Sequence, residues 1–219
     1  VGTDATSFSS STLANGDIIT CDVTGTNSCG SSSTITSNSI TVTVTPNVTP
    51  SLSISASSTS ICAGTSVTFT ASVTDGGSSP SYQWKKNGSN VGTNSATFST
   101  AVLSNNDVIT CVLTANNMCQ TTSTATSNSI TMTVNAVVTP SVAIGASSLS
   151  ICAGTSVTFT ATPTNGGAAP TYQWLVNDVV VAGQTGTTFT YTTPADNDVV
   201  TVVMTSNATC LTAPSDSTD

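Results

Sequence analysis

The chain repeats itself with a period of 90 residues. Residues 60–71 return unchanged as residues 150–161, and residues 50–54 return with conservative changes as residues 140–144. Repetition on this scale is typical of an array of small domains, each stabilised by its own core and by contacts with its neighbours. The period constrains the architecture of the chain far more than it constrains any chemistry.

The first 49 residues follow the same period, because residues 17–21 match residues 107–111. We therefore expect the C-terminal half of a repeat (1–49), a complete repeat (50–139) and a repeat that lacks its last strand (140–219). Residue 1 falls in the middle of a repeat and is not Met, which favours a piece of a longer polypeptide. The alternative is that neighbouring copies donate strands to complete the open ends.

Short period-two stretches of Val, Ile, Thr and aromatic residues predict β-strands throughout the complete repeat. Turn signals such as Asn87-Gly88 separate them. Six or seven short strands in 90 residues is the spacing of a β-sandwich, so the expected fold class is all-β. The expected strands are residues 52–56, 66–73, 81–86, 97–100, 108–115 and 129–134.

Side-chain alternation predicts the core of each sandwich. The expected core aromatic residues are Phe69 and Trp84 in the complete repeat, and Phe159 and Trp174 in the last one. A Trp on the third strand that faces a Cys on a later strand resembles the immunoglobulin pattern. Phe69 stands where the second Cys of that pattern would lie, so we expect no disulfide between the two sheets.

A longer pattern occurs in both later repeats: Ile-Cys-Ala-Gly-Thr-Ser-Val-Thr-Phe-Thr-Ala, then Tyr-Gln-Trp, then Asn-Asp-Val and a late Cys. It closely resembles the tandem immunoglobulin-like or PKD-like repeats of very large surface proteins and gliding-motility adhesins of Bacteroidota. The resemblance implies immunoglobulin-like β-sandwiches arranged as a rod at the cell surface. It also implies export by the type IX system, with outer-membrane attachment through regions outside this chain.

Composition excludes several classes of partner. The chain has 36 Ser and 46 Thr, but only two Lys and no Arg, and its net charge is −8. Nucleic acids and anionic membranes both call for clusters of Lys or Arg. No apolar run approaches the roughly 18 residues of a membrane helix. We therefore expect no nucleic-acid partner and no membrane insertion in this segment.

Five of the seven cysteines lie at repeated loop positions. Cys62 and Cys152 precede the second strand of their repeats, whereas Cys29, Cys119 and Cys210 lie in the loop between the last two strands. Repeated cysteines in a loop-rich β-protein predict disulfides, and therefore an oxidising compartment outside the cell.

Two pairings of these cysteines stay open. Within repeats, Cys62 would bond Cys119 and Cys152 would bond Cys210, whereas across repeats Cys62 would bond Cys210. In an immunoglobulin-like topology the two loops lie at opposite ends of one sandwich, and disulfide Cα atoms must approach within about 7 Å. This topology favours the pairing across repeats. Cys119 would then pair with a Cys in the part of the first repeat that is missing here, and Cys29 and Cys152 would pair with repeats beyond the two ends.

The other two cysteines, Cys21 and Cys111, occupy a position that Val202 fills in the last repeat. Such an exchange indicates a site for a small apolar side chain. We predict that both are buried free thiols without a chemical role.

The sequence offers little for catalysis or metal binding. It has no His and no Glu, so no Ser or Thr hydroxyl has an evident base to activate it. We expect no enzyme activity, no cofactor and no metal site. Asp17, Asp107 and Asp198 precede equivalent strands and are expected to bond the backbone of a turn. Ser217 follows Asp216 in a pattern that Bacteroidota surface proteins use for O-glycosylation, which makes Ser217 a candidate glycan site.

The leading functional hypothesis is a structural stalk segment of a long bacterial cell-surface adhesin or extracellular filament. Short linkers with Pro at residues 45–50 and 135–140 favour a stiff rod. One alternative is a glycan- or surface-binding module that uses loops such as 76–79 and 166–169, and another is a strand-donating subunit of a pilus-like fibre. The expected partners are neighbouring repeats, with other copies in a filament or bundle as a further option. The ligand at the distal end is not identified.

Overall fold

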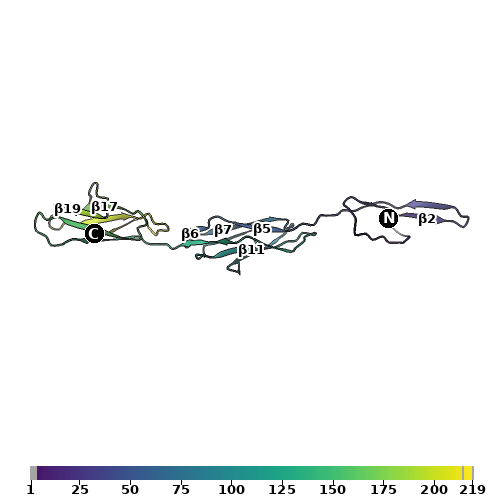
Figure 1. Cartoon of the computed structure of the whole chain (residues 1–219), viewed down its shortest axis with the longest axis horizontal. Helices are drawn as coiled ribbons and strands as arrows, with labels where there is room; N and C mark the ends of the chain where they lie inside the picture. Colours follow the sequence, from purple (N-terminus) through teal and green to yellow (C-terminus); the bar gives the residue numbers. More distant parts are fainter. Residues whose placement is uncertain (1–3, 214, 219) are drawn as a thin grey trace.

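The computed structural model describes residues 4–213 and 215–218, and every regular element in that part is a β-strand. Three units follow one another along one long axis (Figure 1). The N-terminal half-repeat lies at one end and the unit that contains the C-terminus lies at the other. The expected all-β fold is confirmed, and the described residues contain no helix long and apolar enough to cross a membrane.

The half-repeat consists of two small antiparallel sheets, β1 with β4 and β2 with β3. Its apolar side chains remain exposed, with Ile18 at 66%, Ile35 at 73% and Ile40 at 63%. They are exposed because the described residues of this unit form no facing sheet that would cover these side chains. Its strands are β1 (Ile18–Ile19), β2 (Asp22–Thr26), β3 (Ser32–Thr36) and β4 (Ile40–Thr41).

The two main sheets of the middle repeat have strand orders β10-β7-β5 and β12-β11-β8-β9. Strand β13 also pairs with β11, and β14 pairs with β6 in parallel. Strands β5, β7 and β10 in one sheet face β8, β11 and β12 in the other, as strands A, B and E face strands C, F and G in the immunoglobulin-like arrangement. The strands are β5 (Ser51–Ala56), β6 (Ser60–Cys62), β7 (Val67–Thr74), β8 (Ser81–Lys86), β9 (Ser89–Val91), β10 (Thr97–Thr100), β11 (Val108–Thr114), β12 (Thr124–Thr126), β13 (Ile130–Thr131) and β14 (Thr133–Asn135).

The last repeat has the same two sheets, with orders β15-β16-β19 and β18-β17-β20-β21. Strand β21 pairs with β20 as β12 pairs with β11. The described residues of this repeat form no counterpart of β13 and β14, and the segment equivalent to β6 is not a strand. The strands are β15 (Ser141–Ala146), β16 (Val157–Thr164), β17 (Thr171–Val176), β18 (Val179–Val180), β19 (Thr188–Tyr191), β20 (Val200–Thr205) and β21 (Ser215–Thr218).

Each sandwich has a separate core built around one Trp. Phe69 and Trp84 are fully buried in the middle repeat, with ring centroids 6.3 Å apart. The Trp84 Nε1 donates a hydrogen bond to the Ser95 carbonyl at 2.9 Å, which satisfies the one polar atom of the ring. In the last repeat Trp174 is fully buried, whereas Phe159 is only half-buried.

Candidate functional site at the junction between repeats

The junction between the middle and last repeats is held by backbone hydrogen bonds across the linker. The Val138 N–H donates to the Cys210 carbonyl at 2.9 Å, and the Thr212 N–H donates to the Val138 carbonyl at 3.0 Å. On the other side of the linker, the Ala63 N–H donates to the Asn135 carbonyl at 2.9 Å. The linker is therefore paired with a loop of each repeat, which restricts bending between them.

The same junction carries a disulfide between Cys62 and Cys210, whose Cα atoms lie 5.3 Å apart. Strand β14 brings Asn135 opposite Cys62, and three residues later Val138 reaches the loop of Cys210. The two sulfur atoms therefore meet because one linker is paired with both loops. The structure therefore has the pairing across repeats. The alternative partners within repeats, Cys119 for Cys62 and Cys152 for Cys210, are free thiols.

The junction between the half-repeat and the middle repeat has the same geometry, 90 residues earlier. The Val48 N–H donates to the Cys119 carbonyl at 3.0 Å, and the Thr121 N–H donates to the Val48 carbonyl at 2.8 Å. Cys119 thus occupies the place that Cys210 has at the other junction. Residues 1–49 contain no counterpart of Cys62, so Cys119 has no partner thiol within this chain.

The remaining cysteines differ in their surroundings. Cys111 is fully buried, and burial raises the pKa of its thiol to about 11, so the thiol is protonated and unreactive at neutral pH. Cys21 is exposed, which differs from the expectation of a buried thiol. The reason is that the strands that cover Cys111 in the middle repeat have no counterpart in the half-repeat. Cys29 and Cys152 are also exposed free thiols.

A carboxylate fixes the turn that leads into the penultimate strand of each unit, as expected. The Asp107 Oδ2 accepts the Ser104 N–H at 2.8 Å, the Asp198 Oδ2 accepts the Ala195 N–H at 2.7 Å, and the Asp17 Oδ2 accepts the Ala14 N–H at 2.8 Å. These three carboxylates therefore have a structural role.

The middle repeat adds an ion pair that sequence reasoning did not predict. The Lys86 Nζ lies 3.3 Å from the Asp107 Oδ2, and Asp107 is only 6% exposed. The Asn87 Nδ2 also donates to the Asp107 Oδ1 at 2.7 Å. Lys86 therefore satisfies a buried charge.

The loops considered for glycan binding are tied to the loop between the last two strands. Gly77 has a φ of +88°, and a Cβ built on it would lie 2.9 Å from the Asn116 backbone carbon. The Asn116 N–H donates to the Gly76 carbonyl at 3.0 Å, and its Oδ1 accepts the Ser79 N–H at 3.1 Å. Gly76 and Gly77 thus have a structural explanation in this loop contact.

Two further expectations concern modification and metals. Strand β21 includes Ser217, but the Ser217 side chain lies outside the described part, so the candidate glycan site remains a prediction. Among the described residues, no group of three or more His, Cys, Asp or Glu side chains could hold a metal ion.

Comparisons with known proteins bear on the fold alone. No family model matches the sequence, and no curated protein is similar to it. Three N-terminal domains of the outer capsid protein Hoc of bacteriophage RB49 are 17% identical, with a TM-score of 0.35, covering 77% of this chain and 57% of that one.

Two other solved structures are also similar. The eight N-terminal immunoglobulin domains of Down syndrome cell adhesion molecule are 12% identical, with a TM-score of 0.48, covering 94% of this chain and 35% of that one. Fibronectin(III)-like modules of CbhA from Clostridium thermocellum are 14% identical, with a TM-score of 0.35, covering 75% and 90%. The chain spans 57% and 35% of the first two structures. The strand orders of the two later repeats make each of them an immunoglobulin-like β-sandwich.

Proposed function

We propose that this chain is a stiff spacer segment of an extracellular stalk, which holds a distal region away from the surface and transmits tension. The observation that carries this proposal is the Cys62–Cys210 disulfide, which joins consecutive repeats covalently. Structural disulfides of this kind persist in oxidising compartments outside the cytosol. The paired linkers at both junctions add stiffness between the units.

The disulfide also changes the path of a pulling force. Tension applied at the two ends of the chain would pass from Cys62 directly to Cys210. The residues between them, which include most of both sandwiches, would then not be stretched by the applied tension. The sequence separation is 148 residues, so at roughly 3.5 Å per residue about 500 Å of chain is protected from extension.

Single-molecule pulling on the whole chain tests this proposal. Under oxidising conditions we expect only the residues outside the disulfide loop to extend. After addition of a reductant, or in the Cys62→Ser/Cys210→Ser variant, the contour length should increase by about 500 Å. A Cys29→Ser variant is the matched control, because Cys29 is an exposed free thiol, and it should behave like the parent chain. Equal contour lengths with and without reductant would exclude the force bypass.

The cellular setting is a further part of the proposal. The sequence resemblance supports a large Bacteroidota surface protein of the gliding-motility adhesin type, exported by the type IX system and attached to the outer membrane through other regions. Its immediate partners are then neighbouring repeats, with other copies in a filament. Immunogold labelling of intact cells, with a denaturing gel of the native polypeptide, tests this setting. Label confined to the cell interior would contradict it.

A further inference from the structure

The last repeat has an apolar edge strand that is exposed to solvent. Strand β18 pairs only with β17, and its Val179 and Val180 are 69% and 49% exposed. In the sheet β18-β17-β20-β21, β18 lies at the edge opposite β21. Its exposure is therefore independent of the strands at the other edge of the sheet.

The middle repeat protects the equivalent edge with polar residues. Strand β9 has Ser89 and Asn90 in place of the two valines, and they pair with Lys86 and Lys85 of β8. The corresponding partners in β17 are Val and Leu. Lys and polar side chains on an edge strand disfavour pairing with another chain. The edge at β18 lacks this protection.

The backbone at this edge is open at Val180. Val180 lies opposite Leu175, whereas the next residue, Val181, donates its N–H to the Trp174 carbonyl at 2.9 Å. Backbone N–H and carbonyl groups of successive residues point alternately to the two sides of a strand. The N–H and the carbonyl of Val180 therefore point away from β17, toward a position that another strand can occupy.

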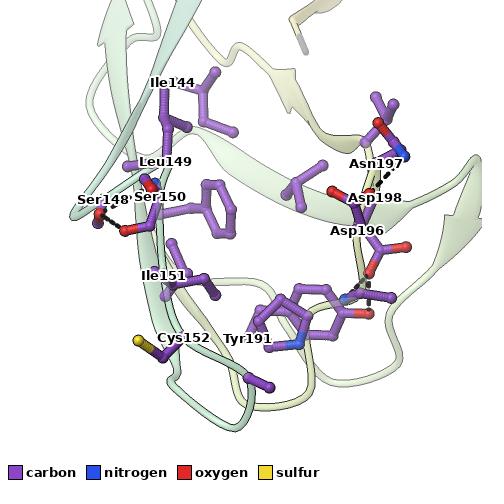
Figure 2. Close-up of a pocket in the computed structure, with 18 of the residues that line it drawn as sticks. Ile144, Ser148, Leu149, Ser150, Ile151, Cys152, Tyr191, Asp196, Asn197 and Asp198 are labelled. Carbon is purple, nitrogen blue, oxygen red and sulfur yellow. Dashed lines mark hydrogen bonds between the residues drawn. The ribbon is translucent and has the colours of Figure 1, made fainter.

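An apolar groove lies beside β18, between the edges of the two sheets. It has a volume of about 550 Å³, and Val179, Val181, Phe189 and Tyr191 are among the residues that line it. Phe189 and Tyr191 come from β19, the edge strand of the other sheet. The Tyr191 O–H donates to the Asp198 Oδ2 at 2.8 Å, which fixes the ring in place (Figure 2). The groove therefore opens on the side where β18 is unpaired.

In the middle repeat the equivalent segment lies directly against the core. A Cβ built on Gly92 would lie 2.9 Å from the Phe98 Cδ2. The last repeat has Ala182 at this position, and residues 182–187 replace residues 92–96, so the segment is one residue longer. Its backbone cannot take the same close path, which explains why a groove is present beside β18.

A second copy of this chain fits the edge at β18. Two β18 strands can pair antiparallel about a two-fold axis at Val180, so that each Val180 N–H donates to the Val180 carbonyl of the other copy. In this register Val179 lies opposite Val181, and Asp178 lies opposite Ala182. Like charges directly opposite each other would destabilise such a pair. The register avoids this, because the Asp178 residues of the two copies do not face each other.

The same register buries apolar side chains on both faces of the extended sheet. Val179 and Val181 line the groove, so their pairing across the two copies joins one groove to the other. Val180 lies between them in the strand and points to the opposite face. There Leu175 and Val180 of both copies form one apolar row. Because a short edge strand buries much less than the about 1,600 Å² of a standard interface, we expect weak, reversible association.

We propose that the last repeat forms a reversible homodimer by antiparallel pairing of β18 with β18 of a second copy. The strands of this repeat run along the long axis of the chain (Figure 1), so the two paired chains run in opposite directions. In a stalk, the contact would join copies that extend toward each other from facing surfaces. That role rests on the proposed function, whereas the dimer does not, and a chain that stays monomeric could still be a stiff spacer.

Sedimentation velocity of the full chain over a range of concentrations tests the dimer. All proteins compared carry Ser at the four free cysteines that are not fully buried, which excludes disulfide-linked chains and keeps the Cys62–Cys210 bond. These four are Cys21, Cys29, Cys119 and Cys152. We expect the mass to rise with concentration from 21.7 kDa toward twice that value. A mass that stays at 21.7 kDa at all concentrations would overturn the proposal.

Two matched variants test whether β18 forms the contact. Val180→Lys places like charges directly opposite each other across the two-fold axis and should abolish the dimer. Because Val180 is exposed, the repeat should stay folded, which unchanged Trp174 fluorescence would show. Asn90→Lys makes the same change at the equivalent edge of the middle repeat and should leave the dimer intact. A dimer that survives Val180→Lys, or that is lost in Asn90→Lys, would overturn the proposal.

Cysteine substitution in the same background tests the register. The two Val180 residues lie opposite each other with Cα atoms about 5.5 Å apart, which a disulfide can span. Val180→Cys should therefore give a linked dimer on a non-reducing gel after treatment with oxidised glutathione. Asp178→Cys is the control, because the two copies of this residue lie about 14 Å apart along the strands, and it should remain unlinked. Linkage at neither position, or equal linkage at both, would overturn the proposal.

Discussion

At the scale of single residues, Asp107 has the most consequential charge in the middle repeat. Burial alone would raise the pKa of Asp107, but the hydrogen bonds from the Ser104 N–H, Asn87 and Lys86 outweigh it and hold the pKa below its usual value. A carboxyl whose pKa is lower in the folded state stabilises that state when ionised. Its contribution is therefore present above the unfolded-state pKa, near 4, and is lost as the pH falls through the folded-state pKa.

We therefore expect Asp107→Asn to lower the unfolding free energy of the middle repeat at pH 7 by about 1–3 kcal/mol, because a charge-assisted bond and the Lys86 ion pair are lost. The variant should also lose less stability than the parent between pH 5 and pH 2. Urea unfolding followed by Trp84 fluorescence in a Trp174→Phe background measures both quantities. Asp4→Asn, at an exposed position, is the control. If the loss of unfolding free energy between pH 5 and pH 2 is the same in Asp107→Asn as in the parent, Asp107 does not determine that loss.

At the scale of elements, one side chain ties the edge strand β5 to the segment between β12 and β13. The Asn128 Oδ1 accepts the Ile54 N–H at 2.8 Å, and the Asn128 Nδ2 donates to the Ile54 carbonyl at 3.1 Å. Asn128→Ala would leave both backbone groups without these partners, at a cost of about 1–3 kcal/mol. We expect faster amide exchange at Ile54 and a lower melting temperature of the middle repeat. Asn38→Ala is the matched control, because no strand equivalent to β5 lies beside Asn38. Equal effects of the two variants would contradict a stabilising role for the hydrogen bonds between Asn128 and Ile54.

Sequence predicted the elements with strong local signals. Residues 81–86 and 97–100 match β8 and β10 at both ends, since alternation and turn residues bound them. The strands β6, β9 and β12 were not predicted, because three-residue strands carry no measurable period and are defined by the strand they pair with. The Lys86–Asp107 ion pair was missed for a related reason, since only the pairing of β8 with β11 brings these residues together.

At the scale of the whole molecule, prediction of the Cys62–Cys210 disulfide required knowing which ends of neighbouring sandwiches meet. Topology was enough to favour the pairing of Cys62 with Cys210 over the pairing with Cys119. The sequence predicted that residues 140–219 lack a last strand, but the side chains that are exposed as a result are visible only when one repeat is compared in space with its neighbour.

The Cys62–Cys210 bond also makes the rod tolerant of a cut backbone. Met118, which is 98% exposed, lies inside the covalent loop, so hydrolysis there would leave both pieces joined. With a protease site introduced at Met118, we expect a cleaved chain to run as one species on a non-reducing gel and as two after reduction. The Cys62→Ser/Cys210→Ser variant should give two pieces in both gels. If the parent chain gives one band in both gels, no cut occurred inside a covalent loop. A stalk built in this way can be nicked by an extracellular protease and still hold whatever it carries.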